Sequence, residues 1–412
     1  MQTNLADFIR DTPEGREADA ILRKCVHCGF CTATCPTYQL LGDELDGPRG
    51  RIYLIKQALE GNEVTAKTQL HLDRCLTCRA CETTCPSGVQ YGRLVDIGRK
   101  IVDERVPRSI GANAKRKAIA TMFPQTALFG LMVKAGKLAR PFLPDALANK
   151  LPKQIPAAGE WPAPRHARKM IALAGCVQPA LDPAINAAAA RVLDRLGISL
   201  VEAPDAGCCG ALRFHLNFQE EGLADMRRLI DAWWPLVEEG AEAIVMTASG
   251  CTTTVKEYGY LLEHDPAYAA KAKRISEMTK DIAEVVAAEF SRLTRLFAAA
   301  PHHQAKRIAF HPPCSLQHGL KVKGVTEKVL AAAGFELVPV PDAHLCCGSA
   351  GTYSILQPAL SAELKKNKLA ALQSGGPSMI LSSNIGCLSH LSGGTELPVM
   401  HWVVALDERL RA

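Results

Sequence analysis

The chain has 412 residues, 48% of them hydrophobic and 22% charged, which excludes a disordered chain and predicts more than one hydrophobic core. Its formal net charge of +6 is modest and spread along the sequence, which argues against a nucleic acid partner. Residues 1–20 lack a basic region followed by an apolar segment, and the uncharged runs are too short or too interrupted to span a membrane. We therefore expect a cytoplasmic chain without a transmembrane segment.

Two runs of cysteines near the N-terminus share one spacing. They read CVHCGFCTATCP (25–36) and CLTCRACETTCP (75–86). Each has three cysteines at successive steps of three, a fourth cysteine four residues later, and then a proline. Cytosolic thiols are kept reduced, so sixteen cysteines in such a chain indicate metal rather than disulfides. Zinc would need two Cys-x-x-Cys pairs per ion, whereas this spacing is typical of two-cluster ferredoxins.

The same spacing predicts which cysteines share a cluster. In two-cluster ferredoxins the fourth cysteine of each run ligates the other cluster, so the ligands cross between the runs. The first 4Fe-4S cluster is thus predicted on Cys25, Cys28, Cys31 and Cys85. The second 4Fe-4S cluster is predicted on Cys75, Cys78, Cys81 and Cys35.

The segment between the runs contains DGPRGRIYLIKQALEG, which predicts a helix opened by Pro48 and closed by Gly61. Arg49 and Arg51 lie near its start. They either belong to a solvated helix face or offset the negative charge of the clusters and tune their potentials. The sequence alone leaves both interpretations open.

A proline-rich stretch over residues 106–167 predicts a partly helical connector. Within it, LFGLMVKAGKLARPF (128–142) predicts a short amphipathic helix. Its apolar side either packs on the protein itself or touches a membrane surface or a partner.

The other eight cysteines form a second duplication. Each copy has a single cysteine, a CCG element 32 positions later, and a final cysteine. The copies are offset by 138 residues, or by 136 at the final cysteine, and an internal duplication is the simplest cause. The members are Cys176, Cys208, Cys209 and Cys251 in the first copy and Cys314, Cys346, Cys347 and Cys387 in the second.

Short apolar runs precede these cysteines and alternate with helical patterns, which predicts α/β units on mostly parallel sheets. Sites in open α/β sheets form beyond the carboxyl ends of the strands, so the eight cysteines can converge there. Gly210 and Gly348 are predicted to allow a backbone turn at each CCG. Buried inert thiols are the alternative to redox or metal chemistry at these cysteines. His311, close to Cys314, is either structural or able to orient a cluster or pass a proton.

These motifs resemble known electron-transfer modules. The first resembles the helical two-cluster ferredoxin domain of succinate dehydrogenase-type and heterodisulfide reductase-type subunits. The repeats resemble the CCG, or cysteine-rich, domains of heterodisulfide reductase. In the fullest pattern of that family the last element is Cys-x-x-Cys, whereas this sequence has SGCTTT and IGCLSH. Each copy therefore lacks one expected ligand, which leaves open a cluster in each repeat, one shared cluster or none.

Over its whole length, including PRGRIYL and NIGC, the chain resembles the family of glycolate oxidase iron-sulfur subunits. The resemblance implies an α-helical two-cluster ferredoxin domain followed by a duplicated α/β (CCG) domain with mostly parallel sheets. The expected division is a ferredoxin-type domain at 1–105, the connector at 106–167, and CCG repeats at 168–300 and 301–412.

The resemblance also implies a function, as a subunit of an oxidoreductase complex. A partner flavoprotein would oxidise glycolate to glyoxylate, and this chain would carry the electrons through its clusters to a membrane quinone. No G-x-G-x-x-G element lies at a strand-helix junction, so we expect neither flavin nor NAD in this chain, and no catalytic residue. The expected partners are flavin-containing glycolate oxidase subunits, and the expected location is peripheral, on the cytoplasmic face of the inner membrane.

Other functions fit the same motifs. They are the equivalent subunit of a lactate or anaerobic glycerol 3-phosphate dehydrogenase, a thiol-disulfide reductase acting at the CCG site, and a redox sensor.

Overall fold

Residues 1–142, 152, 154–299 and 305–411 are described by the computed structural model and group into two units. Unit one comprises Met1–Lys117 and His344–Lys368, and unit two comprises Ala118–Ala343 and Leu369–Ala412. The predicted division into four segments was drawn from the sequence repeats, whereas these two units are defined by contacts in the structure. The four-part division stays a prediction. Its boundary at 300/301 and connector positions 143–151 and 153 lie outside the described residues.

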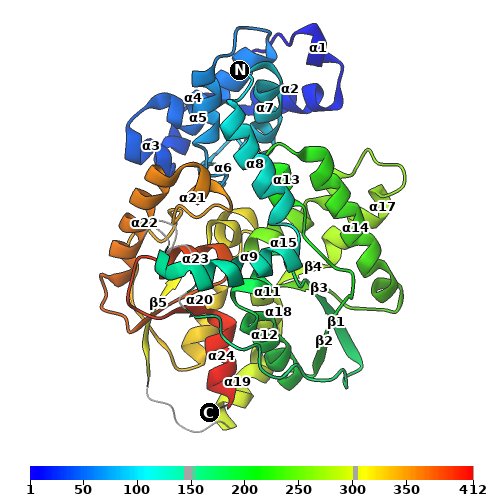
Figure 1. Cartoon of the computed structure of the whole chain (residues 1–412), viewed down its shortest axis with the longest axis vertical. Coiled ribbons are helices and arrows are strands. Elements are labelled where there is room, and N and C mark those ends of the chain that lie inside the picture. The colour runs from blue at the N-terminus through cyan, green and yellow to red at the C-terminus, as the bar shows by residue number, and fades with distance from the viewer. Residues whose placement is uncertain (143–151, 153, 300–304, 412) are drawn as a thin grey trace. The chain divides into compact units, whose positions relative to one another are not determined.

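Unit one contains helices and turns and, within the described residues, no β-strand. Helices α2, α4, α5 and α7 lie side by side (Figure 1). The predicted helix between the cysteine runs is α4, and Pro48 is its first residue. The elements are α1 Asp7–Arg10, α2 Pro13–Lys24, η1 Phe30–Thr32, α3 Pro36–Leu41, η2 Glu44–Asp46, α4 Pro48–Leu59, α5 Ala66–Asp73, α6 Ala80–Thr84, α7 Tyr91–Arg105, α8 Ile110–Met122, α21 Tyr353–Leu356 and α22 Pro358–Gln373, of which α8 and α22 continue into unit two.

Apolar side chains at helical spacing form the core of unit one. Ile55 and Leu59 of α4 are fully buried, as are Leu94 and Val95 of α7. Gly98 of α7 allows the close approach of α4, because a Cβ there would lie 2.5 Å from Ile55 Cγ1. The two cysteine runs are thereby held on a packed helical frame.

Unit two contains two four-stranded sheets in which every described strand pair is parallel. The strand order is β2-β1-β3-β4 in the first sheet and β6-β5-β7-β8 in the second. The identical order agrees with the predicted duplication, and the prediction of parallel sheets is confirmed. The strands are β1 Arg168–Ala172, β2 Ile198–Glu202, β3 Ile244–Met246, β4 Thr279–Asp281, β5 Arg307–His311, β6 Glu336–Leu337, β7 Met379–Ser382 and β8 Val399–His401.

Helices connect the parallel strands, as parallel pairing requires. The helices of unit two are α9 Thr126–Ala139, η3 Arg140–Phe142, α11 Gln178–Leu181, α12 Ala184–Arg195, α13 Ala211–His215, α14 Gln219–Glu238, α15 Ser249–Lys256, α16 Tyr258–Leu261, α17 Ala269–Met278, α18 Ile282–Ala288, α19 Phe290–Ala299, η4 Ser315–Gly319, α20 Val325–Ala332, α23 Ile385–Ser392 and α24 Trp402–Arg411. Of these, α9 and η3 precede β1, and α24 follows β8.

The two repeats share one hydrophobic core within unit two. Ile185 and Leu193 of α12 belong to the same core as Trp402 and Leu406 of α24, and all four are fully buried. Backbone bonds also join the repeats, since Ser249 N donates to Ser383 O over 3.2 Å. The sheets therefore form one body.

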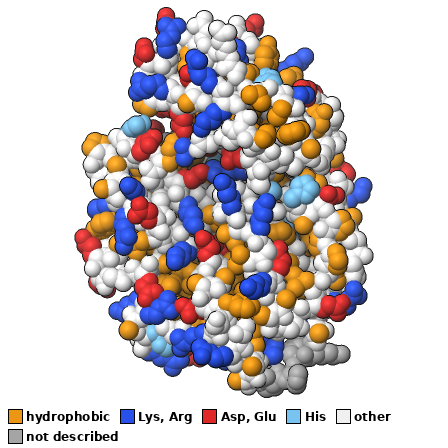
Figure 2. Space-filling model, turned by 180° about the vertical axis from the view of Figure 1, so that it is seen from behind, with side chains coloured by type: hydrophobic (Ala, Val, Ile, Leu, Met, Phe, Trp, Pro, Cys, Tyr) orange, Lys and Arg blue, Asp and Glu red, His pale blue; other side chains and the backbone are white. Residues whose placement is uncertain are grey.

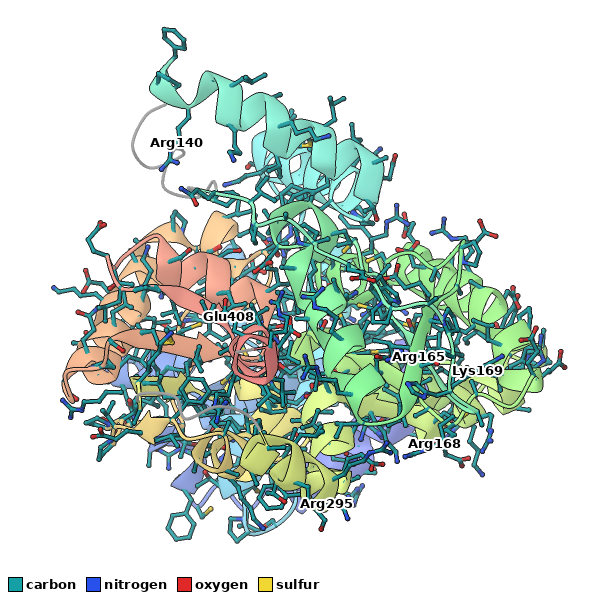
Figure 3. All side chains as sticks on the ribbon, turned by 90° about the horizontal axis from the view of Figure 1, so that it is seen from below. Arg140, Arg165, Arg168, Lys169, Arg295 and Glu408 are labelled. Carbon is teal, nitrogen blue, oxygen red and sulfur yellow. The ribbon has the colours of Figure 1, made fainter. Side chains whose placement is uncertain are left out.

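Ion pairs lie at the amino ends of the strands in the first sheet. Arg165, just before β1, pairs with Asp194, and Arg168 in β1 pairs with Glu242 and Glu289 (Figure 3). On the face drawn in Figure 2, cationic and anionic side chains are likewise interspersed. Cys176, Cys208 and Cys251 follow the opposite, carboxyl ends of β1, β2 and β3.

No helix in the described part of the chain is by itself long and apolar enough to cross a membrane. One bent pair, Ile110–Met122 with Thr126–Phe142, meets the requirement by length and composition only.

We expect Arg191→Ala to destabilise the joint between the repeats. Arg191 on α12 donates to Asp407 Oδ2 on α24 over 2.8 and 2.9 Å, and Asp407 is only 1% exposed. Without Arg191, the buried carboxylate of Asp407 keeps only the half-exposed Arg411 as an ion-pair partner. The free energy of unfolding should therefore fall by about 2 kcal/mol. Chemical denaturation measures this, and the double variant Arg191→Met/Asp407→Leu should recover most of the loss. Equal instability of both variants would contradict the assignment.

Candidate metal centres

The four cysteines predicted for the first cluster line one cavity of unit one. This cavity encloses about 430 Å³, part of it open to solvent, and is lined by Cys25, Cys28, Cys31 and Cys85, together with Cys81. Cys25 directly follows α2, and Cys85 directly follows α6. Helix ends thus position a ligand from each cysteine run.

The four cysteines predicted for the second cluster line a second cavity. It encloses about 300 Å³ and is lined by Cys35, Cys75, Cys78 and Cys81. Cys35 comes from the first run and precedes α3, where Pro36 starts the helix. The grouping is the one that crossed ligands require, and it supports that assignment, which stays a prediction. Cys81 lines both cavities, so the two sites are neighbours.

The two cysteine loops have the same backbone shape. His27 and Gly29 in the first loop and Thr77 and Arg79 in the second have positive φ, at equivalent positions. A left-handed conformation is unfavourable for residues other than glycine, so the surrounding fold must hold it in place. Such turns direct successive backbone N–H groups into a concave site that binds anions, including iron-sulfur clusters. Both loops therefore fit a cysteine-ligated cluster.

Burial raises the pKa values of several of these thiols, so without a metal they stay protonated. It raises the pKa of Cys25, and burial followed by the charge of Cys25 raises the pKa of Cys31 to about 11. Burial also raises the pKa of Cys81 well above its ordinary value, with Cys78 and Cys75 adding to the effect. Because thiolates are the ligands, iron must replace these protons when it binds. Within the described residues the sixteen cysteines form no disulfide, which agrees with the prediction of metal rather than disulfides.

The structure separates the two arginines at the start of α4. Arg49 is 36% exposed and pairs with Glu44 over 2.6 Å, so it belongs mainly to a solvated face. Arg51 is 1% exposed and lines the second cavity. Its guanidinium donates to Asp46 Oδ1 (3.3 Å) and to Thr37 Oγ1 (3.1 Å). The potential-tuning interpretation therefore suits Arg51 and not Arg49.

Further polar groups contact the sulfurs of the second cavity. Tyr91 Oη donates to Cys75 Sγ over 3.6 Å, and Thr77 N donates to the same sulfur over 3.4 Å. Thr37 Oγ1 lies 3.3 Å from Cys35 Sγ. Hydrogen bonds to ligand sulfurs raise the reduction potential of a cluster, so this shell bears directly on redox chemistry.

In the first CCG repeat the structure brings all four predicted cysteines together. Cys208 interacts with Cys176 and with Cys209, which in turn interacts with Cys251. The hydrogen bond with Cys208 and burial raise the pKa of Cys176 well above its ordinary value. Gly210 has φ of 80°, and a Cβ there would lie 2.5 Å from Gly222 O, so the predicted need for glycine holds. Four adjacent thiols at one site suit a metal cluster or dithiol chemistry.

A small cavity adjoins this cysteine group. It is lined by Cys176, Cys251, Gln178 and Thr247. Gln178 Nε2 donates to Thr247 Oγ1 over 2.7 Å, and both side chains are buried. The rest of the lining is apolar, so these two side chains give the cysteine group a small polar contact in a mainly apolar wall without a charged residue.

The second CCG element lies in unit one, whereas Cys314 and Cys387 lie in unit two. Cys346 and Cys347 are buried, and Gly348 has φ of 87° and donates its N–H to Cys346 Sγ over 3.5 Å. Cys387 lies in the first turn of α23, after β7, and His311 is buried at the carboxyl end of β5. Convergence of all eight cysteines stays a prediction.

Two tyrosines belong to these sites that the sequence did not single out. Tyr91 contacts Cys75, and Tyr258 Oη donates to Cys209 O over 2.8 Å. Both are buried. Tyr91 follows the second cysteine run closely, but Tyr258 is 49 positions from Cys209, so only the fold reveals its contact.

Comparison with known proteins agrees with this geometry. A family described as "4Fe-4S dicluster domain" matches residues 21–89, and one described as "Cysteine-rich domain" matches residues 171–256 and 308–392. The matched ranges lie within the predicted segments. The prediction of iron-sulfur clusters is thereby confirmed.

Curated proteins are also similar to this chain. The "Glycolate oxidase iron-sulfur subunit" of Escherichia coli (strain K12) is 55% identical over 410 residues, which cover 100% of this chain and 99% of that protein. The "Probable glycolate oxidase iron-sulfur subunit" of Bacillus subtilis (strain 168) is 29% identical, covering 91% and 89%. "Lactate utilization protein A" of Bacillus licheniformis is 26% identical over 57% of this chain and 97% of that protein.

Exchange of one ligand tests the crossed assignment. We expect Cys35→Ser to perturb the cluster whose other ligands are in the second run, and Cys85→Ser to perturb the cluster of the first run. Each variant should hold roughly four iron atoms where the parent holds about eight. Low-temperature EPR and iron analysis of anaerobically purified protein measure this. A Cys35→Ser protein that loses only the signal assigned to Cys25, Cys28 and Cys31 would show that the ligands do not cross.

Proposed function

Because this chain belongs to the family of glycolate oxidase iron-sulfur subunits, we propose that it is the electron-transfer subunit of a flavin-dependent glycolate oxidase complex. Identity of 55% over the full length with the Escherichia coli protein carries this proposal. A partner flavoprotein oxidises glycolate to glyoxylate, and this chain accepts the electrons and passes them toward a quinone.

Two neighbouring cysteine cavities suit this role. Oxidation of a hydroxyl to a carbonyl delivers two electrons to a flavin, whereas an iron-sulfur cluster takes one electron at a time. The predicted ligands are Cys25, Cys28, Cys31 and Cys85 for one cluster and Cys75, Cys78, Cys81 and Cys35 for the other. In this role the chain's own residues would hold each cluster and set its potential.

Lactate oxidation is a weaker alternative. Lactate utilization protein A matches only 57% of this chain at 26% identity, so it supports a lactate complex only as a distant relative. The CCG cysteines would also suit a thiol-disulfide reductase or a redox sensor, but neither explains two complete cysteine cavities as well as an electron carrier does.

Peripheral attachment to the inner membrane is supported by α9. Phe129 and Val133 on one side of this helix are buried against unit two. The other side exposes Leu131 (64%), Leu138 (83%) and, just beyond the helix, Phe142 (88%). Residues 126–142 carry Lys134, Lys137 and Arg140 and no carboxylate; Arg140 is labelled in Figure 3. An apolar face with a cationic rim suits a surface of anionic lipids.

A substrate screen on the native complex tests the function. The chain, tagged and purified anaerobically from its own cells, should bring a flavoprotein with it. Addition of glycolate should then bleach the cluster absorbance at least tenfold faster than lactate or glycerol 3-phosphate. Bleaching by lactate alone would favour the lactate complex. Clusters that stay oxidised with every substrate, despite a reduced partner flavin, would favour a sensor.

Vesicle binding tests the role of α9. We expect Leu131→Glu/Leu138→Glu to lower the fraction bound to phosphatidylglycerol-containing vesicles at least tenfold, because two buried leucines contribute roughly 3 kcal/mol or more. Leu70→Glu, the same change at an exposed leucine of α5, serves as the control and should bind like the parent. If the α9 variant still binds vesicles but loses its flavoprotein partner, α9 is a protein interface instead.

A further inference from the structure

The second cysteine cavity is surrounded by an excess of positive charge. Arg51 is fully buried, Arg99 is 8% exposed, and Arg74 is 27% exposed. Arg99 donates to Cys75 O over 2.7 Å, directly at a predicted ligand. Arg51 and Arg74 share one carboxylate, Asp46, at 3.3 and 2.7 Å.

Two more charges at this cavity cancel each other. Arg79 lines the cavity, and Glu82 lies close enough to Cys81 to raise the pKa of that thiol, after burial and its cysteine neighbours. Arg51, Arg74 and Arg99 therefore face Asp46. Asp73 also acts on Arg99, but it is paired with Arg108 and Arg116, so the positive excess remains. Charges act more strongly at buried positions than at exposed ones.

The first cavity lacks such an excess. Its arginine, Arg49, is bound by both oxygens of Glu44, and both side chains are exposed to solvent. The amine of Met1 donates to Cys25 O over 2.8 Å, but it is only partly buried, so water and salt screen it. Little buried positive charge therefore acts on this site.

We infer that the buried arginines around Arg51 hold the second cluster at a higher reduction potential than the first, which makes the second cluster the electron exit of unit one. The inference rests on the proposed function. A reduced cluster carries one more negative charge than an oxidised one, so nearby cations stabilise the reduced form. In the transfer, one electron passes from the first cluster to the second, so the first is oxidised and the second is reduced. No proton or bond to the protein changes.

Within unit one, a hydrogen bond joins the segment after the second CCG element to the backbone next to Cys75. Tyr353, six residues after Cys347, donates its hydroxyl to Arg74 O over 3.1 Å, directly before the ligand Cys75. Burial raises the pKa of Tyr353, Arg51 lowers it, and the charges of Cys75 and Cys346 raise it further. Tyr353 thus lies within the electrostatic reach of both cysteine sites.

A redox titration followed by EPR tests this inference on the anaerobically purified complex. Cys35→Ser and Cys85→Ser first assign each signal to its cluster. In the parent, the second cluster should be reduced first. Arg51→Gln should lower the reduced-to-oxidised ratio of the second cluster at least tenfold at a fixed potential, about 59 mV for one electron, and leave the first cluster unchanged.

Matched variants separate charge from folding. Arg49→Gln removes an equal but exposed charge beside the first cavity, and it should shift the first cluster far less than Arg51→Gln shifts the second. Arg51→Lys should remain close to the parent, and Tyr91→Phe, which removes a hydrogen bond to Cys75, should shift the second cluster in the same direction as Arg51→Gln. If Arg51→Gln does not fold, Arg74→Gln removes a less buried charge of the same group and should shift the second cluster in the same direction.

Two results would overturn the inference. One is a parent whose first cluster is reduced at the higher potential, and the other is equal shifts from Arg49→Gln and Arg51→Gln. A parent without two 4Fe-4S signals is a different failure, because it removes the proposed function together with this inference.

Discussion

The buried ion pair between Arg51 and Asp46 organises the segment that joins the two cysteine runs. Moving both charges out of water is costly unless further hydrogen bonds satisfy them. Arg51 Nε donates to His71 O over 2.7 Å, and Arg74 binds the second oxygen of Asp46 over 2.7 Å. The pair thereby connects α4, η2 and α5 and holds them beside Cys35 and Cys75. Removing either partner would leave an uncompensated charge next to the second cavity, so the geometry of that cavity depends on this pair.

Duplication determines the rest of the architecture. The two cysteine loops place left-handed residues at equivalent positions, and the two sheets have the same strand order. In the first repeat, parallel strands end next to Cys176, Cys208 and Cys251, so four thiols from separate segments meet at one site. The repeats differ in packing, however, because residues 344–368 of the second belong to unit one. That difference brings one CCG element, and not the other, into the unit that holds the 4Fe-4S sites.

Much of this could be predicted from the sequence, because cysteine spacing is a local signal with a specific geometric meaning. The grouping of Cys35 with the second run and the need for glycine at 210 and 348 follow from it. Strands β4 and β8 were not predicted, because each has only three residues and, unlike the equally short β3, neither leads to a cysteine element that marks it. The sequence also could not separate Arg49 from Arg51, which are two positions apart and differ only in tertiary burial. Tyr258 and Tyr353 contact their sites across long separations along the chain, which no local pattern records.

The central claim is that two clusters with crossed ligands lie close enough to act as one electron carrier. The most direct measurement is the EPR spectrum of the anaerobic, fully reduced protein at two microwave frequencies. Two neighbouring paramagnetic clusters should broaden and split each other's signals by a frequency-independent amount, and the interaction should disappear in protein that holds one cluster. Two sharp spectra that simply add, with no interaction at full reduction, would contradict the account.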